Sequence, residues 1–387
     1  MRNQLLACLP LVWAAWAEPR IGDPLAQWRG AVKVRPVSAT TDRHTVHTYF
    51  NLSPESPDGR WVLFYASKQR EGYTGEIRIQ ERATGKEIVL ARNVTVEDAH
   101  RAACQQWVAG GRRVVFHDVR GGEWMGVAVD VATRGERILA RGRQVAWGQP
   151  DKEVVPTYAP HWAPGPNPDL EIVDVETGRA SKVVTAASVR EQYPDLVAKE
   201  FGDRPISIFF PIMSPDLKRV VFKMATSTGN DFRSKAASHR ELLVGYDLER
   251  KRFLFCLTRW GHPSWLPDSR TILNTGPVLI DSDTGSARKV PSLPVFPGSH
   301  PSMNRSGELF ATDTLMSGFG GGKTDWGVAV GDIRGGGYKI VHSFANDQGA
   351  ASWRVSHPHP AFSADGKRLY FNVNDTAFTR LFVAEAP

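Results

Sequence analysis

A polar turn followed by a short apolar strand recurs along the whole chain. The first copy has Ser-Pro-Asp-Gly at residues 56–59, and the apolar run Trp61 to Phe64 follows it. Similar turns are centred on residues 58, 110, 216, 268, 306 and 365, which we use as turn markers. Most intervals are about 50 residues, and the double interval after residue 110 predicts a degenerate copy near residues 147–155. The pattern therefore predicts seven repeats.

Each marker is followed by further apolar strands that a second turn joins. Thr-Gly turns at residues 84–85, 177–178 and 284–285 separate such strands. With the strands around the marker, each repeat reads as a four-stranded antiparallel unit. Seven such units predict an all-β fold, a seven-bladed β-propeller, because a sandwich has no fixed period and a TIM barrel needs intervening helices. Residues 187–201 show the only long helical pattern, between the third and fourth repeats.

The last repeat is one strand short. Residues 381–384 can form its third strand, and the chain ends at Pro387. A three-stranded blade would leave an open edge. Residues 31–37 alternate between apolar and polar side chains, so we predict that they pair with residues 381–384 and close the ring.

The first 17 residues have the features of an export signal: Arg2, an apolar stretch and Ala15-Trp16-Ala17. We predict a single propeller domain over residues 18–387, a periplasmic or extracellular location, and no membrane span. The chain of 387 residues has a net charge of +7, and +6 without this signal. This charge favours an anionic partner, and the lack of long Lys/Arg runs argues against nucleic acid. Cys104 and Cys256 are expected to be isolated thiols.

Histidines gather in front of the turns of the last three repeats. His262, His300 and His359 each lie three residues before a large apolar residue, and His357 shares a strand face with His359. We expect these four imidazoles to converge at one mouth of the central channel. They would suit Zn, Mn, Fe, Ni or Cu, or acid–base chemistry, whereas a purely structural plug of histidines is the alternative.

Two residues in the first half of the chain could line the same mouth of the channel, although the sequence supports this less strongly. His100 opens the second repeat and Tyr158 lies in the third. Packing in the core or in loops would explain both residues equally well. Trp107, Trp265 and Phe362 are expected to be core residues by the same alignment of repeats.

The motifs at the predicted mouth resemble those of oligogalacturonate lyases. These motifs are His-x-x-Trp-x-Pro-Asp at residues 262–268, His-Pro-Ser at 300–302 and His-Pro-His-Pro at 357–360. The Asp-Gly turns themselves are shared by propellers of the TolB type. The resemblance is closest in the fourth to seventh repeats, and it implies a lyase that acts on a pectin-like oligogalacturonate or another uronate-containing glycan. Since that family typically acts inside the cell, an export signal favours a different acidic polymer.

The resemblance also implies a metal site. In the family, a manganese-type ion is held by one His of the sixth blade, two of the seventh and a Gln. The matching His residues are His300, His357 and His359, but Arg354 stands in the place of the Gln. The resemblance thus implies a divalent metal, with Mn as the first choice. Arg354 would instead bind a substrate carboxylate directly.

Catalytic roles follow for His262 and Arg240. A lyase removes the proton α to a uronate carboxylate and expels the C4 oxygen, so it needs a cation, a base and an acid. The family's catalytic His and Arg match His262 and Arg240, with Arg240 as the expected base and His262 beside the carboxylate or the leaving oxygen. An arginine base requires a neighbouring metal and burial that favour its neutral form, and without them His262 is the more conventional base. Ulvan lyases use His, Tyr and Arg on a related propeller, which keeps His100 and Tyr158 as candidate substrate-binding residues.

Two other function classes stay open. One is a TolB-like propeller that binds a protein partner without any chemistry, and it needs no convergence of histidines. The other is a hydrolase or isomerase that uses the same metal. Only a lyase would create an unsaturated sugar.

Overall fold

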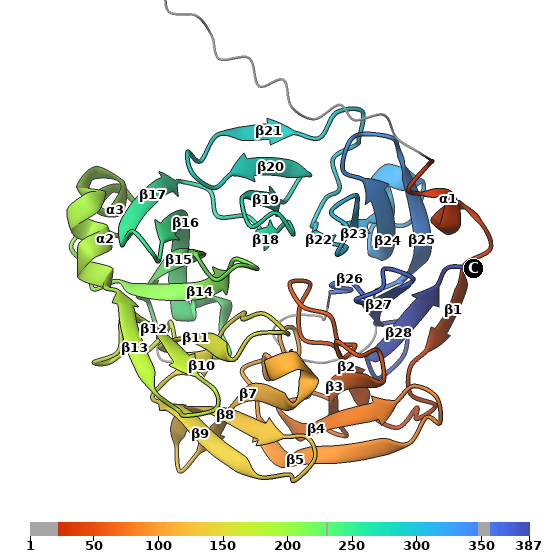
Figure 1. The fold of residues 1–387 in the computed structure, drawn as a ribbon, viewed down its shortest axis with the longest axis horizontal. Coiled ribbons are helices and arrows are strands. Elements are labelled where there is room, and N and C mark those ends of the chain that lie inside the picture. The colour runs from red at the N-terminus through yellow and green to blue at the C-terminus, as the bar shows by residue number, and fades with distance from the viewer. Residues whose placement is uncertain (1–21, 230, 347–356) are drawn as a thin grey trace, which may run out of the picture.

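The strands of the chain form seven separate four-stranded antiparallel sheets in a ring (Figure 1). The computed structural model describes residues 22–229, 231–346 and 357–387. The predicted seven-bladed propeller is confirmed. The degenerate repeat is the third blade, in which the turn between β10 and β11 covers the predicted region near residues 147–155.

The first three blades follow one another along the chain, each running from the channel outward (Figure 1). Blade 1 contains β2 (His44–Val46), β3 (Trp61–Ser67), β4 (Thr74–Glu81) and β5 (Glu87–Thr95). Blade 2 contains β6 (Gln106–Val108), β7 (Arg113–Arg120), β8 (Glu123–Asp130) and β9 (Glu136–Arg141). Blade 3 contains β10 (Gln144–Val145), β11 (Val154–Tyr158), β12 (Leu170–Asp174) and β13 (Ala180–Val184).

The other four blades complete the ring. Blade 4 contains β14 (Ser207–Met213), β15 (Arg219–Ser227), β16 (Ser238–Asp247) and β17 (Arg252–Leu257). Blade 5 contains β18 (Ser264–Trp265), β19 (Thr271–Asn274), β20 (Val278–Asp281) and β21 (Ala287–Lys289). Blade 6 contains β22 (Ser302–Met303), β23 (Leu309–Leu315), β24 (Asp325–Asp332) and β25 (Tyr338–Ala345). Blade 7 contains β26 (Ala361–Phe362), β27 (Arg368–Val373), β28 (Arg380–Glu385) and β1 (Lys33–Pro36).

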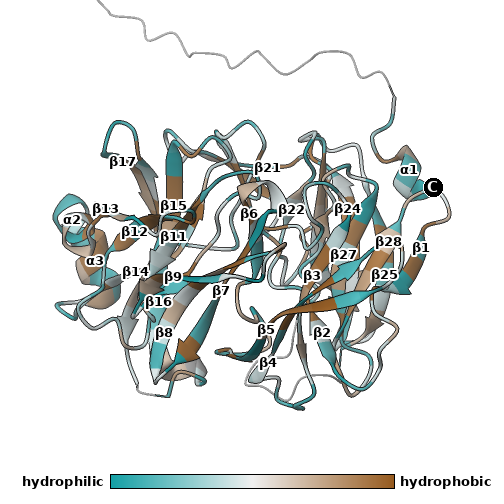
Figure 2. Cartoon of the chain, turned by 60° about the horizontal axis from the view of Figure 1, so that its bottom comes forward, coloured by the Kyte–Doolittle hydropathy of each residue, from teal (hydrophilic) through white to brown (hydrophobic). Residues whose placement is uncertain are grey.

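The core lies between neighbouring blades. Hydrophobic positions follow the strands, whereas many connecting loops are hydrophilic (Figure 2). The sixth residue after a turn marker is a fully buried phenylalanine in four blades: Phe64, Phe116, Phe222 and Phe371. Burial of one such side chain contributes about 1.5–3 kcal/mol, so the repeated position adds to the stability of these four blades. Trp107, Trp265 and Phe362 are buried as predicted.

The helical insertion between blades 3 and 4 contains two helices rather than the single one expected. These are α2 (Ala186–Gln192) and α3 (Pro194–Phe201), which lie at the outer edge of the ring (Figure 1). The side chain of Thr185 caps α2 by accepting a hydrogen bond from the Ser188 backbone at 3.0 Å. Pro194 cannot donate to a preceding carbonyl, so the first helix stops before it and a second begins there. A further short helix, α1 (Ala26–Arg29), precedes β1.

An N-terminal strand supplies the outer strand of blade 7. β1 pairs antiparallel with β28, and Val34 lies opposite Ala384. This is the pairing expected from the alternating pattern of residues 31–37. The seventh blade therefore contains three strands from one end of the described chain and one from the other.

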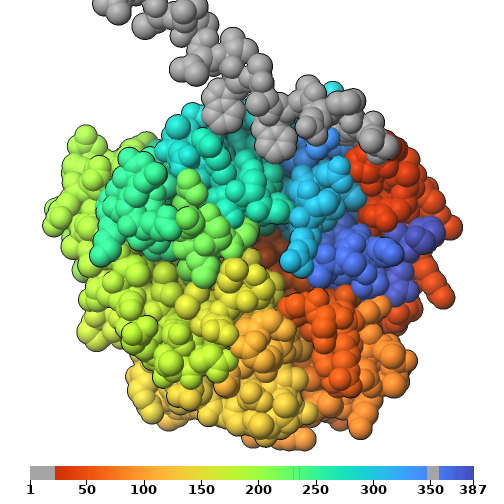
Figure 3. Space-filling view, viewed as in Figure 1, coloured from red at the N-terminus to blue at the C-terminus, as the bar shows by residue number. Residues whose placement is uncertain are grey.

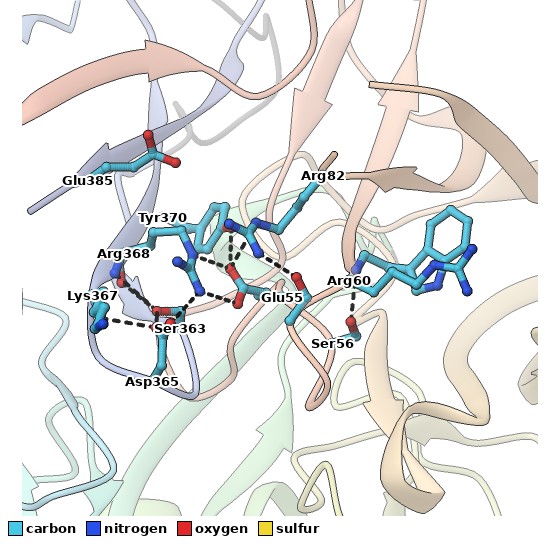
Figure 4. A network of polar contacts seen from close by, with 12 residues as sticks. Glu55, Ser56, Arg60, Arg82, Ser363, Asp365, Lys367, Arg368, Tyr370 and Glu385 are labelled. Atoms are coloured by element: carbon cyan, nitrogen blue, oxygen red, sulfur yellow. Dashed lines mark hydrogen bonds and ion pairs between the residues drawn. The ribbon is translucent and has the colours of Figure 1, made fainter. Parts of the chain in front are cut away.

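A buried ion pair also links blade 7 to blade 1. The carboxylate of Glu55, whose side chain is 1% exposed, accepts hydrogen bonds from Arg368 at 2.8 and 2.9 Å (Figure 4). The hydroxyl of Tyr370 donates to the same carboxylate, and Arg82 lies 3.6 Å from it. Bidentate contacts of this kind are directional and strong. They fix the seam between the first and last blades.

Two further expectations can be compared with the structure. Cys104 and Cys256 are both free, as predicted. In the described part of the chain, no helix has the length and apolar character that crossing a membrane requires. The export signal predicted for residues 1–17 lies outside the described residues.

Candidate metal centre and active site

The histidines of blades 5, 6 and 7 meet at one end of the channel. Each precedes the innermost strand of its blade, so the side chains enter the channel at the amino ends of β18, β22 and β26. The ring centroids of His300 lie 4.1 Å from His262, 5.0 Å from His357 and 4.6 Å from His359. The predicted convergence of four imidazoles is confirmed.

A fifth imidazole joins them from blade 2. His100, in the segment between β5 and β6, lies 4.6 Å from the ring of His357 and 4.5 Å from that of His359. One ligand atom each of His100, His300, His357 and His359 lies within 4.8 Å of all the others. We call these four residues the histidine cluster. His100 was predicted as a candidate substrate-binding residue, and the structure places it at the distance of a metal ligand, a role that the sequence analysis did not assign to it.

A buried carboxylate orients two members of the histidine cluster. Asp313 on β23 is fully buried, and its oxygens lie 2.9 and 3.0 Å from Nδ1 of His300. Because a carboxylate only accepts hydrogen bonds, Nδ1 carries the proton and Nε2 is left as the ligand atom. The same carboxylate accepts the backbone N–H of His359 at 3.1 Å. His359 has a φ of +47°, an uncommon conformation that this contact helps to hold.

His359 is the most deeply buried member of the cluster. Its side chain is 0% exposed, and within the described residues neither ring nitrogen has a hydrogen-bond partner. Burial, followed by the neighbouring imidazoles, holds its pKa well below the ordinary value. A buried imidazole that is neutral and lacks partners has the state and the environment of a metal ligand.

His262 lies beside the histidine cluster and outside it. Its Nδ1 donates to the carbonyl of Ser299 at 3.1 Å, which leaves Nε2 with the basic lone pair. The hydroxyl of Thr275 accepts its backbone N–H, also at 3.1 Å. Burial, then the charges of His300 and Lys223, keep the pKa of His262 well below its ordinary value. The imidazole is therefore neutral at physiological pH and able to accept a proton.

Two aromatic side chains from blade 1 fill the channel beneath the imidazoles. The ring of Tyr49 lies 4.5 Å from His359 and is stacked 5.4 Å from Trp147. Phe50 lies 5.5 Å from His300 and 5.9 Å from His262. They follow β2, so the chain crosses the channel directly after its first inner strand. These two buried rings give the cluster a largely aromatic surrounding on this side.

Arg240 and Tyr158 both lie against the ring of Phe209. The Arg240 guanidinium is 5.7 Å from the Phe209 ring centroid, and the Tyr158 ring is 5.6 Å from it. Tyr158 is 0% exposed, and its hydroxyl accepts from the guanidinium of Arg101 at 3.2 Å. Burial raises the pKa of Tyr158. Tyr158 thus belongs to a buried network, and its contact with substrate stays a prediction.

That network is centred on Glu97 and connects blades 2, 3 and 4. Glu97 forms an ion pair with Arg101 and lies 3.4 Å from Nε2 of His161. The other ring nitrogen of His161 contacts the Ser238 hydroxyl at 2.6 Å. Asp98, next in the chain, accepts the backbone N–H of His100 at 2.8 Å. The network thus anchors the segment that carries His100. Arg354 lies outside the described residues.

Sequence analysis missed the polar row behind the histidines. The seventh residue after a turn marker is Thr275, Asp313 and Asn372 in blades 5, 6 and 7, and each supports a histidine segment of its own blade. Asn372, for example, donates to the carbonyl of His357 at 3.3 Å. A signal was present, because Asp313 and Asn372 lie in strands whose residues are mostly apolar. In blade 4 the same position holds Lys223.

A separate pocket lies at the opposite end of the channel. It has a volume of about 430 Å³, and its lining includes Phe50, Trp147, Trp265, Arg305 and Phe362. These residues lie at or after the carboxyl ends of the innermost strands, whereas the histidines lie before their amino ends. One face of the ring is hollowed near its centre (Figure 3). None of the histidines described above lines this pocket.

Comparison with known proteins gives matches among solved structures only. No protein-family model matches the chain, and no curated protein matches it. An oligogalacturonate lyase in complex with manganese superimposes with a TM-score of 0.61 and 17% identity, covering 92% of this chain and 93% of the other. An oligogalacturonate lyase from Vibrio parahaemolyticus superimposes with a TM-score of 0.62 at 16% sequence identity. The match covers 92% of this chain and 94% of the other. The chain has the fold of the oligogalacturonate lyases.

More distant propellers match less well. A β-propeller domain from Myceliophteria thermophila gives a TM-score of 0.51 at 11% identity, covering 89% of this chain and all of the other. The resemblance inferred from the motifs at the mouth is therefore confirmed at the level of the fold. The first oligogalacturonate lyase contains manganese, and the present chain places four imidazoles where they could hold a divalent metal.

Proposed function

We propose that the protein is a polysaccharide or oligosaccharide lyase that cleaves a 4-linked, uronate-containing glycan by β-elimination. The observation that carries the proposal is the histidine cluster, whose four ligand atoms lie within 4.8 Å of one another, with the neutral His262 beside it. The likeness of fold to the oligogalacturonate lyases supports the same reaction class. The basic composition of the chain suits an acidic substrate.

The residues present fit a divalent metal. His359 offers a buried ring whose nitrogens have no hydrogen-bond partner among the described residues, and Asp313 presents Nε2 of His300 as a ligand. Such a carboxylate–histidine pair behind a ligand is a common feature of metal sites. When bound, the metal would withdraw charge from the substrate carboxylate and so acidify the neighbouring C–H group.

We further propose that His100 is the fourth protein ligand. The family's Gln is replaced by Arg354, which cannot act as a ligand at neutral pH because a guanidinium has no free lone pair. His100 supplies the missing donor from the segment between β5 and β6. Manganese remains our first choice from the resemblance. A site made only of imidazoles would also accept Zn, Fe, Ni or Cu, so metal identity needs direct measurement.

The reaction requires three events at one sugar ring. The proton at C5 is removed, the bond between C4 and its glycosidic oxygen breaks, and the leaving oxygen gains a proton. His262 is placed to accept the C5 proton through Nε2, because its Nδ1 is engaged by Ser299. Arg240 was the expected base. We assign it to the substrate's charged or leaving groups, because an arginine stays protonated near neutral pH.

Location and domain organisation belong to the proposal as well. Residues 1–17 would direct export to the periplasm or the extracellular space, and residues 18–387 would act as one propeller domain. The natural substrate would then be an acidic polymer outside the cytoplasm. Nucleic acid and membrane spanning play no part in the proposal.

The deciding experiment offers the purified protein a panel of uronate polymers and follows ultraviolet absorbance. β-Elimination creates a conjugated double bond between C4 and C5, whereas hydrolysis does not. We expect absorbance to rise with at least one polymer and to stop rising after chelation. An increase in reducing ends without absorbance would indicate a hydrolase. No cleavage of any uronate would favour a binding protein.

A further inference from the structure

Lys223 is a buried charge in the row of residues that supports the histidines. It is the seventh residue after the marker at residue 216, in the same repeat position as Thr275, Asp313 and Asn372. Those three residues each hold a histidine segment of their own blade. Blade 4 has Phe209 opposite this position in place of a histidine, with a bulge in the strand pairing directly after it.

The ammonium group of Lys223 lies among aromatic rings next to the candidate site. Its Nζ is 3.5 Å from the ring centroid of Trp260 and 4.6 Å from that of Phe210, while the residue is only 2% exposed. The electron-rich faces of the two rings attract the cation and help to hold it in this position. A substrate carboxylate brought to this place would meet a buried positive charge, and opposite charges attract each other more strongly in a poorly hydrated site than in water.

The geometry links this ammonium group to the proposed reaction centre. Trp260 lies 5.3 Å from the ring of His262, and His262 lies 4.1 Å from that of His300. Lys223 is thus separated from the candidate base by a single indole ring. That span is comparable to one sugar ring, and an indole face is the surface on which the apolar side of a sugar packs.

We propose that Lys223 and Trp260 form a subsite that binds a carboxylate-bearing sugar next to His262. Lys223 would pair with the carboxylate, and Trp260 would pack against the ring. The inference rests on the proposed substrate class and adds the residue that selects for the acid. In this role Lys223 is a substrate-binding residue and carries out no proton transfer.

The test compares two small probes that differ only in charge. Methyl galacturonoside carries a carboxylate at C5, methyl galactoside carries a hydroxymethyl group there, and neither has a sugar at O4 to expel. Binding of each is measured by NMR titration for the wild type, Lys223→Met and Lys218→Met. Lys218 is a matched control, because it precedes the same strand but is 52% exposed and pairs with Glu249. Metal content is measured in parallel to establish that each variant keeps its histidine cluster.

We expect the wild type and Lys218→Met to prefer the acid by at least tenfold, and Lys223→Met to lose that preference while keeping its metal. Lys223→Arg should restore part of it. A preference that survives in metal-loaded Lys223→Met would overturn the subsite alone. A wild type without any preference for the acid would contradict the proposed substrate class itself. If Lys223→Met loses its metal, the Lys223→Arg variant is used for the decision. The subsite is rejected if metal-loaded Lys223→Arg binds methyl galacturonoside no more tightly than methyl galactoside.

Discussion

Asp313 contacts Nδ1 of His300 through both carboxylate oxygens, at 2.9 and 3.0 Å, in a part of the core that water does not reach. One side chain thereby decides which nitrogen of His300 can bind a metal. It also accepts the backbone N–H of His359 and so sets the position of a second proposed ligand. This carboxylate therefore links blades 6 and 7.

Replacement of Asp313 should weaken metal binding without removing a ligand. We expect Asp313→Asn to lower the affinity for a divalent metal by about 10–100-fold, because an amide neither fixes the tautomer nor raises the basicity of the imidazole. Competition with a chelating dye measures the change. Asp365→Asn, in the exposed turn of blade 7, should leave the affinity unaltered. Equal affinities in both variants would remove Asp313 from the site.

His100 offers a direct test of the fourth ligand. His100→Ala should reduce metal affinity at least tenfold, since one of four donors is lost. His342→Ala is the control, because His342 is a partly buried histidine on β25. If the His100 variant binds metal as tightly as the control does, the site has only three protein ligands.

His262 is expected to be essential for elimination and dispensable for metal binding. His262→Asn should reduce turnover on a uronate polymer by at least about 10², the usual scale for a lost base. The same variant should contain as much metal as the wild type. Near-normal turnover would move proton abstraction to another residue, of which Arg240 is the next to test by substitution with Met.

Acid should destabilise the protein through its buried histidines. Burial lowers the pKa of His117 to about 3 and that of His161 to about 4, from an unfolded value near 6.5. Below pH 6.5 these histidines become protonated in the unfolded chain, whereas in the folded chain they stay neutral down to about pH 4. The free energy of unfolding therefore falls as the pH is lowered from 6.5. Each histidine contributes a slope of about 1.4 kcal/mol per pH unit. Denaturant unfolding at several pH values between 7 and 5 measures this slope, with a chelator present so that metal binding does not contribute.

The control for this pH dependence is a change at one of these histidines. In His117→Gln the free energy of unfolding should depend less steeply on pH. The slope should fall by the contribution of one histidine, because glutamine does not titrate. A stability that stays constant from neutral pH down to about pH 5 would be incompatible with the buried neutral histidines.

The ion pair between Glu55 and Arg368 should contribute to stability. Glu55→Gln removes a charge that accepts two hydrogen bonds from the guanidinium, and we expect the free energy of unfolding to fall by about 2 kcal/mol. Arg112→Met, which removes an exposed contact with Glu153 between blades 2 and 3, should have almost no effect. Denaturant titration compares the two, and equal losses would show that the first seam has no special role.

The sequence predicts the fold well because the repeat is long and its turns are chemically distinctive. Asp58 and Gly59 mark a turn in any protein, and a seven-fold period leaves one architecture. The division of residues 187–201 into α2 and α3 was also readable, since Pro194 interrupts the pattern. The spacing of apolar residues alone continues past this proline and therefore predicts one helix.

The site was predictable only where its residues belong to the repeat. His300 and His359 occupy equivalent positions, so alignment of the blades brings them together. His100 comes from an irregular segment before β6, and no alignment of the repeats places its ring beside that of His357. Lys223 and Asp313 were visible as charges inside apolar strands. Their meaning needed the structure, because strand period shows which face a side chain shares but not what it contacts.

The pairing of β1 with β28 has a consequence for folding kinetics. Six blades consist of strands that are neighbours in the chain, whereas Lys33 must find Glu385 across nearly the entire sequence. The entropy of closing such a loop grows only slowly with its length, so the equilibrium cost is modest. Contacts of high sequence separation nevertheless slow the search. We expect six blades to assemble first and the seventh to close last, so the lifetime of the native ring would depend on how often this one strand detaches.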